Sequence, residues 1–394
     1  MSSSANISHH DVETLASLIA SQPESIEILP GDASAWVPPD SEHHPYLLVE
    51  GNLGVPQKEL YKVYVQAVSV FARARRSDAV KALYSCTGAG SRSTSSSAIT
   101  PPSQRDTTLA AFDAQDPSIR TLIAASTILA LANPAHQTAL SARRRLISSG
   151  LIDARSELWF TRAVLLCARH CAKEAGLWFH RRWVLARVHG CDFGEDGARS
   201  EKMGTMEMAD VKRELEMAGR ACEVYPRNYF AWMHRVVCVR LVLSSLRAGS
   251  EHAGGGRGVE FVQGEMRDVR AWIDVHVGDY SAVHHLVSVL RAILLDEGFD
   301  AGAVEVGKRE LEMAVEHSGG LVRAYPGHEA LWMYVRAVYA LALEVDMSPG
   351  SLEDATVDLL ASSGDHSEET AWNAGQFGKW KEVFVRKGGS GIMP

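Results

Sequence analysis

The chain has 394 residues, of which 46% are hydrophobic, and its formal net charge is −8. This length and composition allow a large buried core, whereas the negative charge argues against a protein that binds nucleic acid through a basic face. No apolar stretch approaches the ~20 residues needed to cross a bilayer, so we expect no integral membrane segment.

The N-terminal residues and the cysteines indicate the cellular compartment. The segment Met1 to Asn6 has no basic start followed by an apolar core, unlike a secretory signal. The six cysteines include no Cys-x-x-Cys pair, which indicates a reducing compartment and thiols that pack as small hydrophobes. We therefore expect a soluble, cytoplasmic protein.

Residues 1–65 are predicted to form an irregular N-terminal lead-in. They contain the apolar run 47–55, and a helix is expected over residues 57–83. Residues 88–106 are rich in Ser, Thr, Pro and Gly, and residues 249–258 have a similar composition. Because both segments have too few apolar side chains to offset their ordering entropy, we predict mobile insertions there.

Residues 66–345 carry a recurring motif, in which an aromatic residue, usually Trp, is followed two or three residues later by His, Arg or both. Copies recur at intervals of about 40 to 55 residues, which is typical of stacked supersecondary units that share one continuous core. The five aligned positions are Leu140, Trp178, Trp232, Val283 and Trp332, and in two of them Leu140 and Val283 replace the aromatic residue.

Each unit is predicted to be a helical hairpin. Before the third motif, apolar residues at steps of three and four mark one face of a helix, which Pro226 ends. Asn228 is then a suitable N-cap for the next helix. The hexapeptide Arg-Glu-Leu-Glu-Met-Ala occurs at 213–218 and again at 309–314, so the fifth unit repeats the third with about one extra helical turn.

The predicted fold is therefore all-α, an α–α superhelix (solenoid) of stacked helical hairpins. Residues 346–394 follow the array as an acidic, Ser-rich linker and a terminal helix around residues 372–385.

The motif residues have structural and functional interpretations. Trp178, Trp232 and Trp332 are expected to fill space between hairpins, because one aromatic side chain buries about 150–250 Å². Arg181 and Arg235 lie three residues after Trp on the same helical face. Two roles stay open for them, a structural clamp between successive hairpins and the binding of a partner.

Other polar residues of the motif are candidates for contact with a partner. His180 and Arg182 flank the face of Arg181, and we expect them to reach the concave surface of the array. Arg336 of the fifth motif is a further partner-facing candidate.

Few patterns point to independent catalysis. Cys167 and Cys171, with His170 beside them, are compatible with half of a metal site or with an apolar stripe; the lack of a second pair at zinc-finger spacing favours the stripe. The sequence has no Gly-rich phosphate loop, nucleophile elbow or His-Glu-x-x-His motif. We therefore expect this chain to bind no metal or cofactor and to have no catalytic residue in isolation.

The third motif reads Pro226-x-Asn228-Tyr229-x-x-Trp232-x-x-Arg235. The repetition of this pattern along the chain resembles the repeats of protein prenyltransferase α subunits, the helical partners in farnesyl- and geranylgeranyltransferases. The resemblance covers residues 45–340, approximately, and rests on five ordered copies of the motif.

The resemblance implies a superhelix that wraps around a separate β subunit, which carries the zinc and most of the isoprenoid pocket. A farnesyl or geranylgeranyl group would pass from prenyl diphosphate to a cysteine near the C-terminus of a protein substrate. In this family, the turn before the third motif presents a basic residue and a Tyr to the diphosphate. The matching positions here are Arg227 and Tyr229, with His234 one turn further on.

The chemistry of this turn suits an anion, because a guanidinium would lie beside the free N–H groups of a helix start. The alternative is a solvated turn residue, Arg227, next to a packing ring, Tyr229.

Two functions therefore remain. The first is an α-type prenyltransferase subunit that is active only with a β subunit. The second is a non-catalytic scaffold or adaptor that keeps the helical array, and the fourth and fifth motifs favour it because Leu286 and Val335 replace the Arg.

Overall fold

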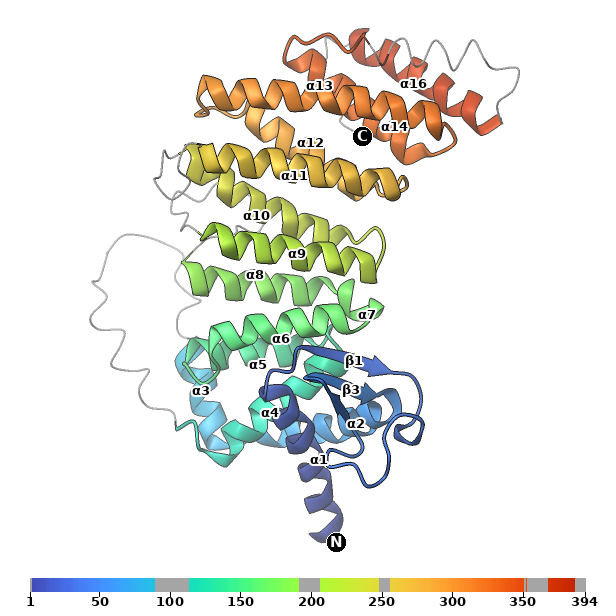
Figure 1. Cartoon of the computed structure of the whole chain (residues 1–394). Coiled ribbons are helices and arrows are strands. Elements are labelled where there is room, and N and C mark those ends of the chain that lie inside the picture. Colours follow the sequence, from blue (N-terminus) through green and yellow to red (C-terminus); the bar gives the residue numbers. More distant parts are fainter. Residues whose placement is uncertain are drawn as a thin grey trace, which may run out of the picture. The chain divides into compact units, whose positions relative to one another are not determined.

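The computed structural model describes residues 2–88, 113–190, 206–247, 256–350, 352 and 368–386 (Figure 1). It divides into two compact units, Met1–Phe193 and Gly194–Pro394, and each is described by itself. Within the described residues, helices form almost all of the regular structure, with one small sheet in the first unit. The predicted all-α fold of stacked helical hairpins is confirmed.

The N-terminal lead-in is regular, so the prediction of an irregular segment is wrong. It contains α1 (Ser2–Ala20), β1 (Ser25–Leu29), a 3-10 turn η1 (Ala33–Ala35), β2 (Leu47–Val49) and β3 (Asn52–Pro56). The sheet order is β1-β3-β2, with β1 parallel and β2 antiparallel to β3. The central strand buries Leu53 and Val55 completely, and this burial stabilises a pairing between segments that are distant in sequence.

The helix expected over residues 57–83 is two helices, α2 (Gln57–Ala74) and α3 (Asp78–Gly88). The break comes after Arg75, whose N–H still bonds back to Phe71. Ser77 then accepts the N–H of Val80 at 3.3 Å, and such a side-chain cap favours a new helix start over continuation.

The first unit contains the first two predicted hairpins. One pairs α4 (Pro117–Ala132) with α5 (Gln137–Ser148), and the other pairs α6 (Ala154–Cys167) and a short α7 (Arg169–Ala172) with α8 (Ala175–His189). Asp116 caps α4 by accepting two backbone N–H groups, ahead of Pro117 at the first helical position.

The second unit contains the other three hairpins (Figure 1). They pair α9 (Met208–Val224) with α10 (Tyr229–Arg247), α11 (Gly256–Val275) with α12 (Tyr280–Leu295), and α13 (Ala301–Ala324) with α14 (Glu329–Glu344). All five aligned positions of the motif fall on the second helix of a hairpin. The expected longer helix of the fifth unit is also present, since α13 has 24 residues and α9 has 17.

The two predicted insertions lie mainly outside the described residues, which omit 89–112 and 248–255. The end of the second differs from the prediction, because α11 begins at Gly256. Gly258 allows this helix to start close to α10, since a Cβ there would meet Leu246 Cδ2 at 2.2 Å.

The terminal helix predicted around residues 372–385 is α16 (Glu368–Arg386), and the linker before it, 353–367, lies outside the described residues. Its Phe377 ring lies 6.0 Å from Trp332 and 5.8 Å from Tyr339, both on α14. The helix therefore covers the last hairpin, as a terminal cap does in a repeat array.

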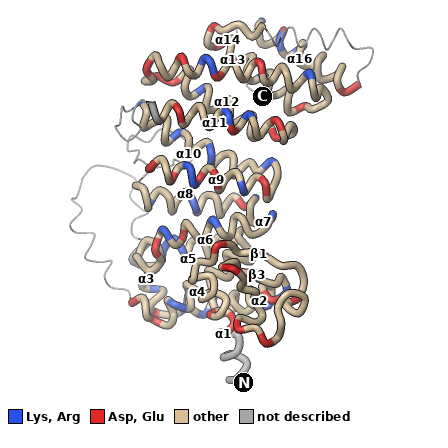
Figure 2. Tube along the Cα trace, viewed as in Figure 1, with Lys and Arg blue, Asp and Glu red and all other residues tan. Residues whose placement is uncertain are grey.

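Within the described residues, no helix is both long and apolar enough to cross a membrane. Lys and Arg are interspersed with Asp and Glu along the helices of each unit (Figure 2).

Candidate functional site

The turn between α9 and α10 presents two exposed side chains. Asn228 is buried; it accepts the N–H of Ala231 at 3.1 Å and donates to the carbonyl of Ala221 at 3.4 Å, which confirms the predicted N-cap. Arg227 is exposed in a left-handed conformation with φ 58°, and Tyr229 is 54% exposed. This left-handed backbone is uncommon for a residue other than glycine, and it occurs here directly before the N-cap Asn228.

Tyr229 also lines an apolar groove of about 220 Å³ that crosses α10, α12 and α14. Tyr280, at the start of α12, lines it too and is similarly exposed. Between these rings the lining is mostly apolar, including Met233, Val287 and Met333. Such a surface suits an apolar ligand or the apolar side chains of a partner protein.

The predictions that His234 lies near the diphosphate and that His180 faces a partner are wrong. Both side chains are fully buried. The Nε2 atom of His180 lies 2.7 Å from Glu157 Oε1, and that of His234 lies 2.9 Å from Glu214 Oε2. Two residues after the Trp the helix has turned by about 200°, so this position faces the first helix of its own hairpin.

The carboxylates that meet these histidines form a recurring feature, here called the glutamate ladder. In the fourth hairpin, His285 Nε2 lies 2.7 Å from Glu265 Oε1. A fourth buried glutamate on the first helix of the fifth hairpin, Glu310, meets an arginine in place of a histidine. The ladder thus consists of four buried carboxylates on the first helices of hairpins two to five: Glu157, Glu214, Glu265 and Glu310.

Motif arginines reach the ladder from the preceding hairpin. Arg143 on α5 donates Nε and Nη2 to the two oxygens of Glu157 on α6, at 2.8 and 2.5 Å. Arg235 on α10 does the same to Glu265 on α11, at 2.5 and 2.7 Å. Planar guanidinium groups match carboxylates in this two-bond geometry, so these arginines clamp successive hairpins together.

The ladder persists where the motif arginine is missing. In the fourth hairpin Leu286 stands at the arginine position, and Arg270 of α11 instead donates to Glu310 Oε2 at 2.7 Å. The arginine that pairs with Glu310 is thus on the first helix of the preceding hairpin, whereas the arginines that pair with Glu157 and Glu265 are on the second helix.

The charges of the ladder follow from these contacts. Burial opposes the ionised form of Glu265, but Arg235 and His285 outweigh it and hold its pKa at about 2. Burial lowers the pKa of His285. Glu157, with a pKa of about 2, and His180, whose pKa burial also lowers, repeat the pattern. Each such cluster therefore combines an anionic Glu, a charged Arg and a neutral His.

Arg181 and Arg182 differ in their surroundings. Arg181 is buried, and its Nη1 donates to the Leu158 carbonyl at 2.6 Å and to Thr161 Oγ1 at 2.9 Å. Arg182 is half-buried, with its guanidinium carbon 4.7 Å from the centre of the Phe179 ring. Arg181 is therefore a packing residue, whereas Arg182 is partly accessible.

Arg336 contacts the terminal helix of its own chain. Its guanidinium carbon lies 6.0 Å from the centre of the Trp380 ring on α16, and burial lowers its pKa. The surface beside Arg336 is thus covered in part by α16.

The motif tryptophans are buried, as expected. Trp178 Nε1 donates to the Ala172 carbonyl at 2.8 Å, and Trp332 Nε1 donates to the Pro326 carbonyl at 2.7 Å. Each indole thereby holds the turn that precedes its helix.

Trp232 makes a different contact that links two hairpins. Its Nε1 donates to Asp279 Oδ2 at 3.1 Å, and Trp272 Nε1 donates to the same oxygen at 3.1 Å. The other oxygen of Asp279 accepts the N–H of Ser281 at 3.1 Å and so caps α12.

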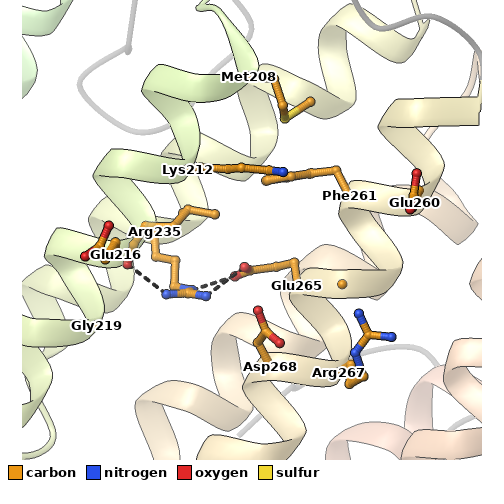
Figure 3. A pocket seen from close by; sticks show the side chains of 12 residues that line it. Met208, Lys212, Glu216, Gly219, Arg235, Glu260, Phe261, Glu265, Arg267 and Asp268 are labelled. Atoms are coloured by element: carbon orange, nitrogen blue, oxygen red, sulfur yellow. Dashed lines mark hydrogen bonds and ion pairs between the residues drawn. The ribbon is translucent and has the colours of Figure 1, made fainter.

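A polar pocket of about 740 Å³ lies between α9 and α11 and was not predicted (Figure 3). The Arg235–Glu265 pair spans it, as the dashed lines in Figure 3 show. Lys212 and Arg267 line it together with Asp268 and other acidic residues. Because both signs of charge are present, the pocket does not select an anion or a cation by charge alone.

The thiols that the sequence left open as half of a metal site do lie together. Cys167 Sγ is 3.6 Å from Cys171 Sγ, and His170 Nε2 is 3.4 Å from Cys171 Sγ. Within the part of the chain that the structure describes, however, no three His, Cys, Asp or Glu side chains form a group able to hold a metal ion. We therefore treat Cys167 and Cys171 as a thiol pair.

The glutamate ladder is the feature that sequence reasoning missed. A signal was present, because the duplicated hexapeptide places Glu214 and Glu310 at the same point of two hairpins. A repeated Glu on the apolar side of a helix indicates a buried carboxylate with a cationic partner.

Residues 211–242, from α9 into α10, match the family model described as protein prenyltransferase alpha subunit repeat. The third hairpin, which holds Arg227 and Tyr229, is therefore similar to this repeat. The match confirms the resemblance seen in the sequence.

The chain is also similar to curated proteins named after this repeat. Protein prenyltransferase alpha subunit repeat-containing protein 1 of Homo sapiens is 27% identical over 282 residues, which are 63% of this chain and 66% of the relative. The Danio rerio protein of the same name is 25% identical over 248 residues, 56% of this chain and 54% of the relative. The matches thus span between about half and two thirds of the length of these relatives.

Proposed function

We propose that this chain is the α-type subunit of a protein prenyltransferase. It assembles with a separate β subunit that holds the zinc. The complex transfers a geranylgeranyl or farnesyl group from prenyl diphosphate to a cysteine near the C-terminus of a protein substrate.

The observation that carries this proposal is the exposed pair Arg227 and Tyr229 on a capped turn of the matching repeat. A guanidinium can donate two parallel hydrogen bonds to a diphosphate, and the start of α10 adds the partial positive charge of a helix N-terminus. Tyr229, two residues after this cation, lines the apolar groove.

The apolar groove supports contact with the β subunit. Its half-exposed tyrosines and its methionines are residue types enriched at protein interfaces. Arg182, which is partly accessible, is the partner-facing candidate on the first unit. We expect an obligate-type interface, above ~2,000 Å² in total.

The experiment is co-expression of the full chain with prenyltransferase β subunits, followed by purification and transfer of label from prenyl diphosphate. Arg227→Ala should weaken prenyl diphosphate binding by about ten- to a hundred-fold, because a charge-assisted hydrogen bond contributes ~1.5–3 kcal/mol. Heterodimer formation should persist. Arg220→Ala is the matched control, since Arg220 is an exposed arginine of the same hairpin that pairs with exposed Glu216.

Tyr229→Phe separates two roles of the ring. Slower transfer with retained assembly means that the hydroxyl acts at the reacting group, and unchanged transfer means that the ring only packs. If Arg227→Ala matches Arg220→Ala in both diphosphate affinity and turnover, the proposed diphosphate site is wrong.

A non-catalytic scaffold or adaptor is the second candidate, and the glutamate ladder favours it. His180, His234 and Arg235 are all used in packing, so the recurring motif is accounted for by stability alone. A chain that binds a β subunit but supports no transfer with any prenyl diphosphate would favour the scaffold.

A further inference from the structure

Cys167 and Cys171 meet at a break between two helices. Cys167 is the last residue of α6, Ala168 is extended with φ −163° and ψ 154°, and Arg169 begins α7. The break brings the two sulfur atoms to 3.6 Å. A disulfide bond requires about 2.05 Å, so a small approach of the two side chains closes it.

The two thiols differ in access. Cys171 is fully buried, whereas Cys167 is partly exposed. His170 is exposed, and its ring nitrogen lies 3.4 Å from the buried sulfur of Cys171. The hydrogen bond with Cys167 and burial raise the pKa of the Cys171 thiol, so Cys171 needs a proton acceptor to react. These differences assign the first attack to Cys167 and a resolving role to Cys171.

We propose that Cys167 and Cys171 form a redox modification site, which closes to an intramolecular disulfide when a hydroperoxide oxidises Cys167. In the first step the Cys167 sulfur attacks the peroxide, an S–O bond forms and the O–O bond breaks. The leaving alkoxide or hydroxide takes the thiol proton, and Cys167 becomes a sulfenic acid.

In the second step Cys171 attacks the sulfur of this sulfenic acid. The S–S bond forms, the S–O bond breaks, and the proton of Cys171 passes by way of His170 to the leaving hydroxide, which departs as water. Two thiols and one hydroperoxide thus give one disulfide, one alcohol (water, when the oxidant is hydrogen peroxide) and one further water. A thiol reductant returns the disulfide to two thiols by exchange and is itself oxidised to a disulfide.

The site also has a structural connection. Ala172, next to Cys171, is the residue whose carbonyl accepts the indole N–H of Trp178. Closing the disulfide ties α7, and with it this turn, to the end of α6.

Trypsin offers a direct test, because it cuts after Arg169, between the two cysteines. The full chain is treated with hydrogen peroxide, the remaining thiols are alkylated under denaturing conditions, and the digest is analysed by mass spectrometry. We expect peptides 163–169 and 170–173 as one disulfide-linked species, which dithiothreitol separates. Cys222 and Cys238, both buried, serve as internal controls and should remain reduced.

Two variants test the assigned roles. Cys171→Ser should stop at the sulfenic acid and give a dimedone adduct on Cys167, whereas Cys167→Ser should give neither adduct nor link. The wild-type digest decides the proposal whether or not the variants fold. Overoxidation of Cys167 without a link to Cys171, or no oxidation of either thiol before Cys222 reacts, would overturn it.

Discussion

Breaking the clamp between the third and fourth hairpins should destabilise the second unit strongly. Arg235 makes two hydrogen bonds, of 2.5 and 2.7 Å, to Glu265, which is 3% exposed. Among the residues that the structure describes, Arg235 is the cation that pairs with this carboxylate, and burial favours the neutral form of His285 beside it. Arg235→Ala therefore leaves a buried carboxylate without its cation. Removing one partner of a buried ion pair costs about 3–5 kcal/mol, so we expect a loss of this size in the free energy of unfolding.

Urea unfolding followed by circular dichroism measures this loss, and an exposed ion pair provides the control. Arg291 and Glu344 join α12 to α14 with both side chains about one third exposed. Arg291→Ala should therefore cost only ~0–1 kcal/mol, because solvent screens such pairs.

The double variant Arg235→Met with Glu265→Leu distinguishes two causes of destabilisation, an unpaired buried charge and the loss of the contact itself. Without an unpaired buried carboxylate, much of the stability lost in Arg235→Ala should return. If Arg235→Ala and Arg291→Ala shift the urea midpoint equally, the ladder does not clamp the hairpins and our account of the motif is refuted.

Two further predictions concern stability. Trp232→Ala should lower the free energy of unfolding by about 3–5 kcal/mol, because it opens a cavity. Trp372→Ala is the control and should lower it far less, since the Trp372 side chain is 66% exposed. Equal urea midpoints for the two variants would contradict the packing role of Trp232. Burial lowers the pKa of His285 in the folded protein, so as the pH falls this residue is protonated in the unfolded chain before it is protonated in the folded one. The stability contributed by the neutral ring is therefore complete above the unfolded pKa of about 6.5 and falls as the pH drops below it. Urea midpoints measured from pH 7.5 to 5 should decrease more steeply for the wild type than for His285→Gln, and parallel curves would show that His285 does not contribute.

The hairpins could be predicted from sequence because their signals are local. The apolar stripe before Pro226, the cap at Asn228 and the spacing of the Trp positions each depend on residues within one or two turns. The N-terminal sheet could not be predicted in the same way, since its central strand pairs with distant segments.

The orientation of His180 and His234 could not be predicted for a different reason. The second helix of each hairpin is covered on more than one side, so periodicity alone does not tell which buried face a polar residue joins. From sequence alone a histidine is expected to be exposed, because the buried carboxylate that pairs with it, such as Glu157 with His180, lies on another helix. Arg227 and Tyr229 lie at the turn before α10 and at its start, and both are exposed, whereas their contact with a diphosphate stays a prediction.

Asp279 has a consequence for how the second unit unfolds. One of its oxygens holds Trp232 of the third hairpin, while the other starts the second helix of the fourth. In a linear array, the strength of coupling between neighbours decides whether repeats melt singly or together. The start of α12 and the packing of Trp232 depend on the same carboxylate, so local unfolding of either hairpin destabilises the other. We therefore expect the protected amide hydrogens of these two repeats to exchange together, as one cooperative unit.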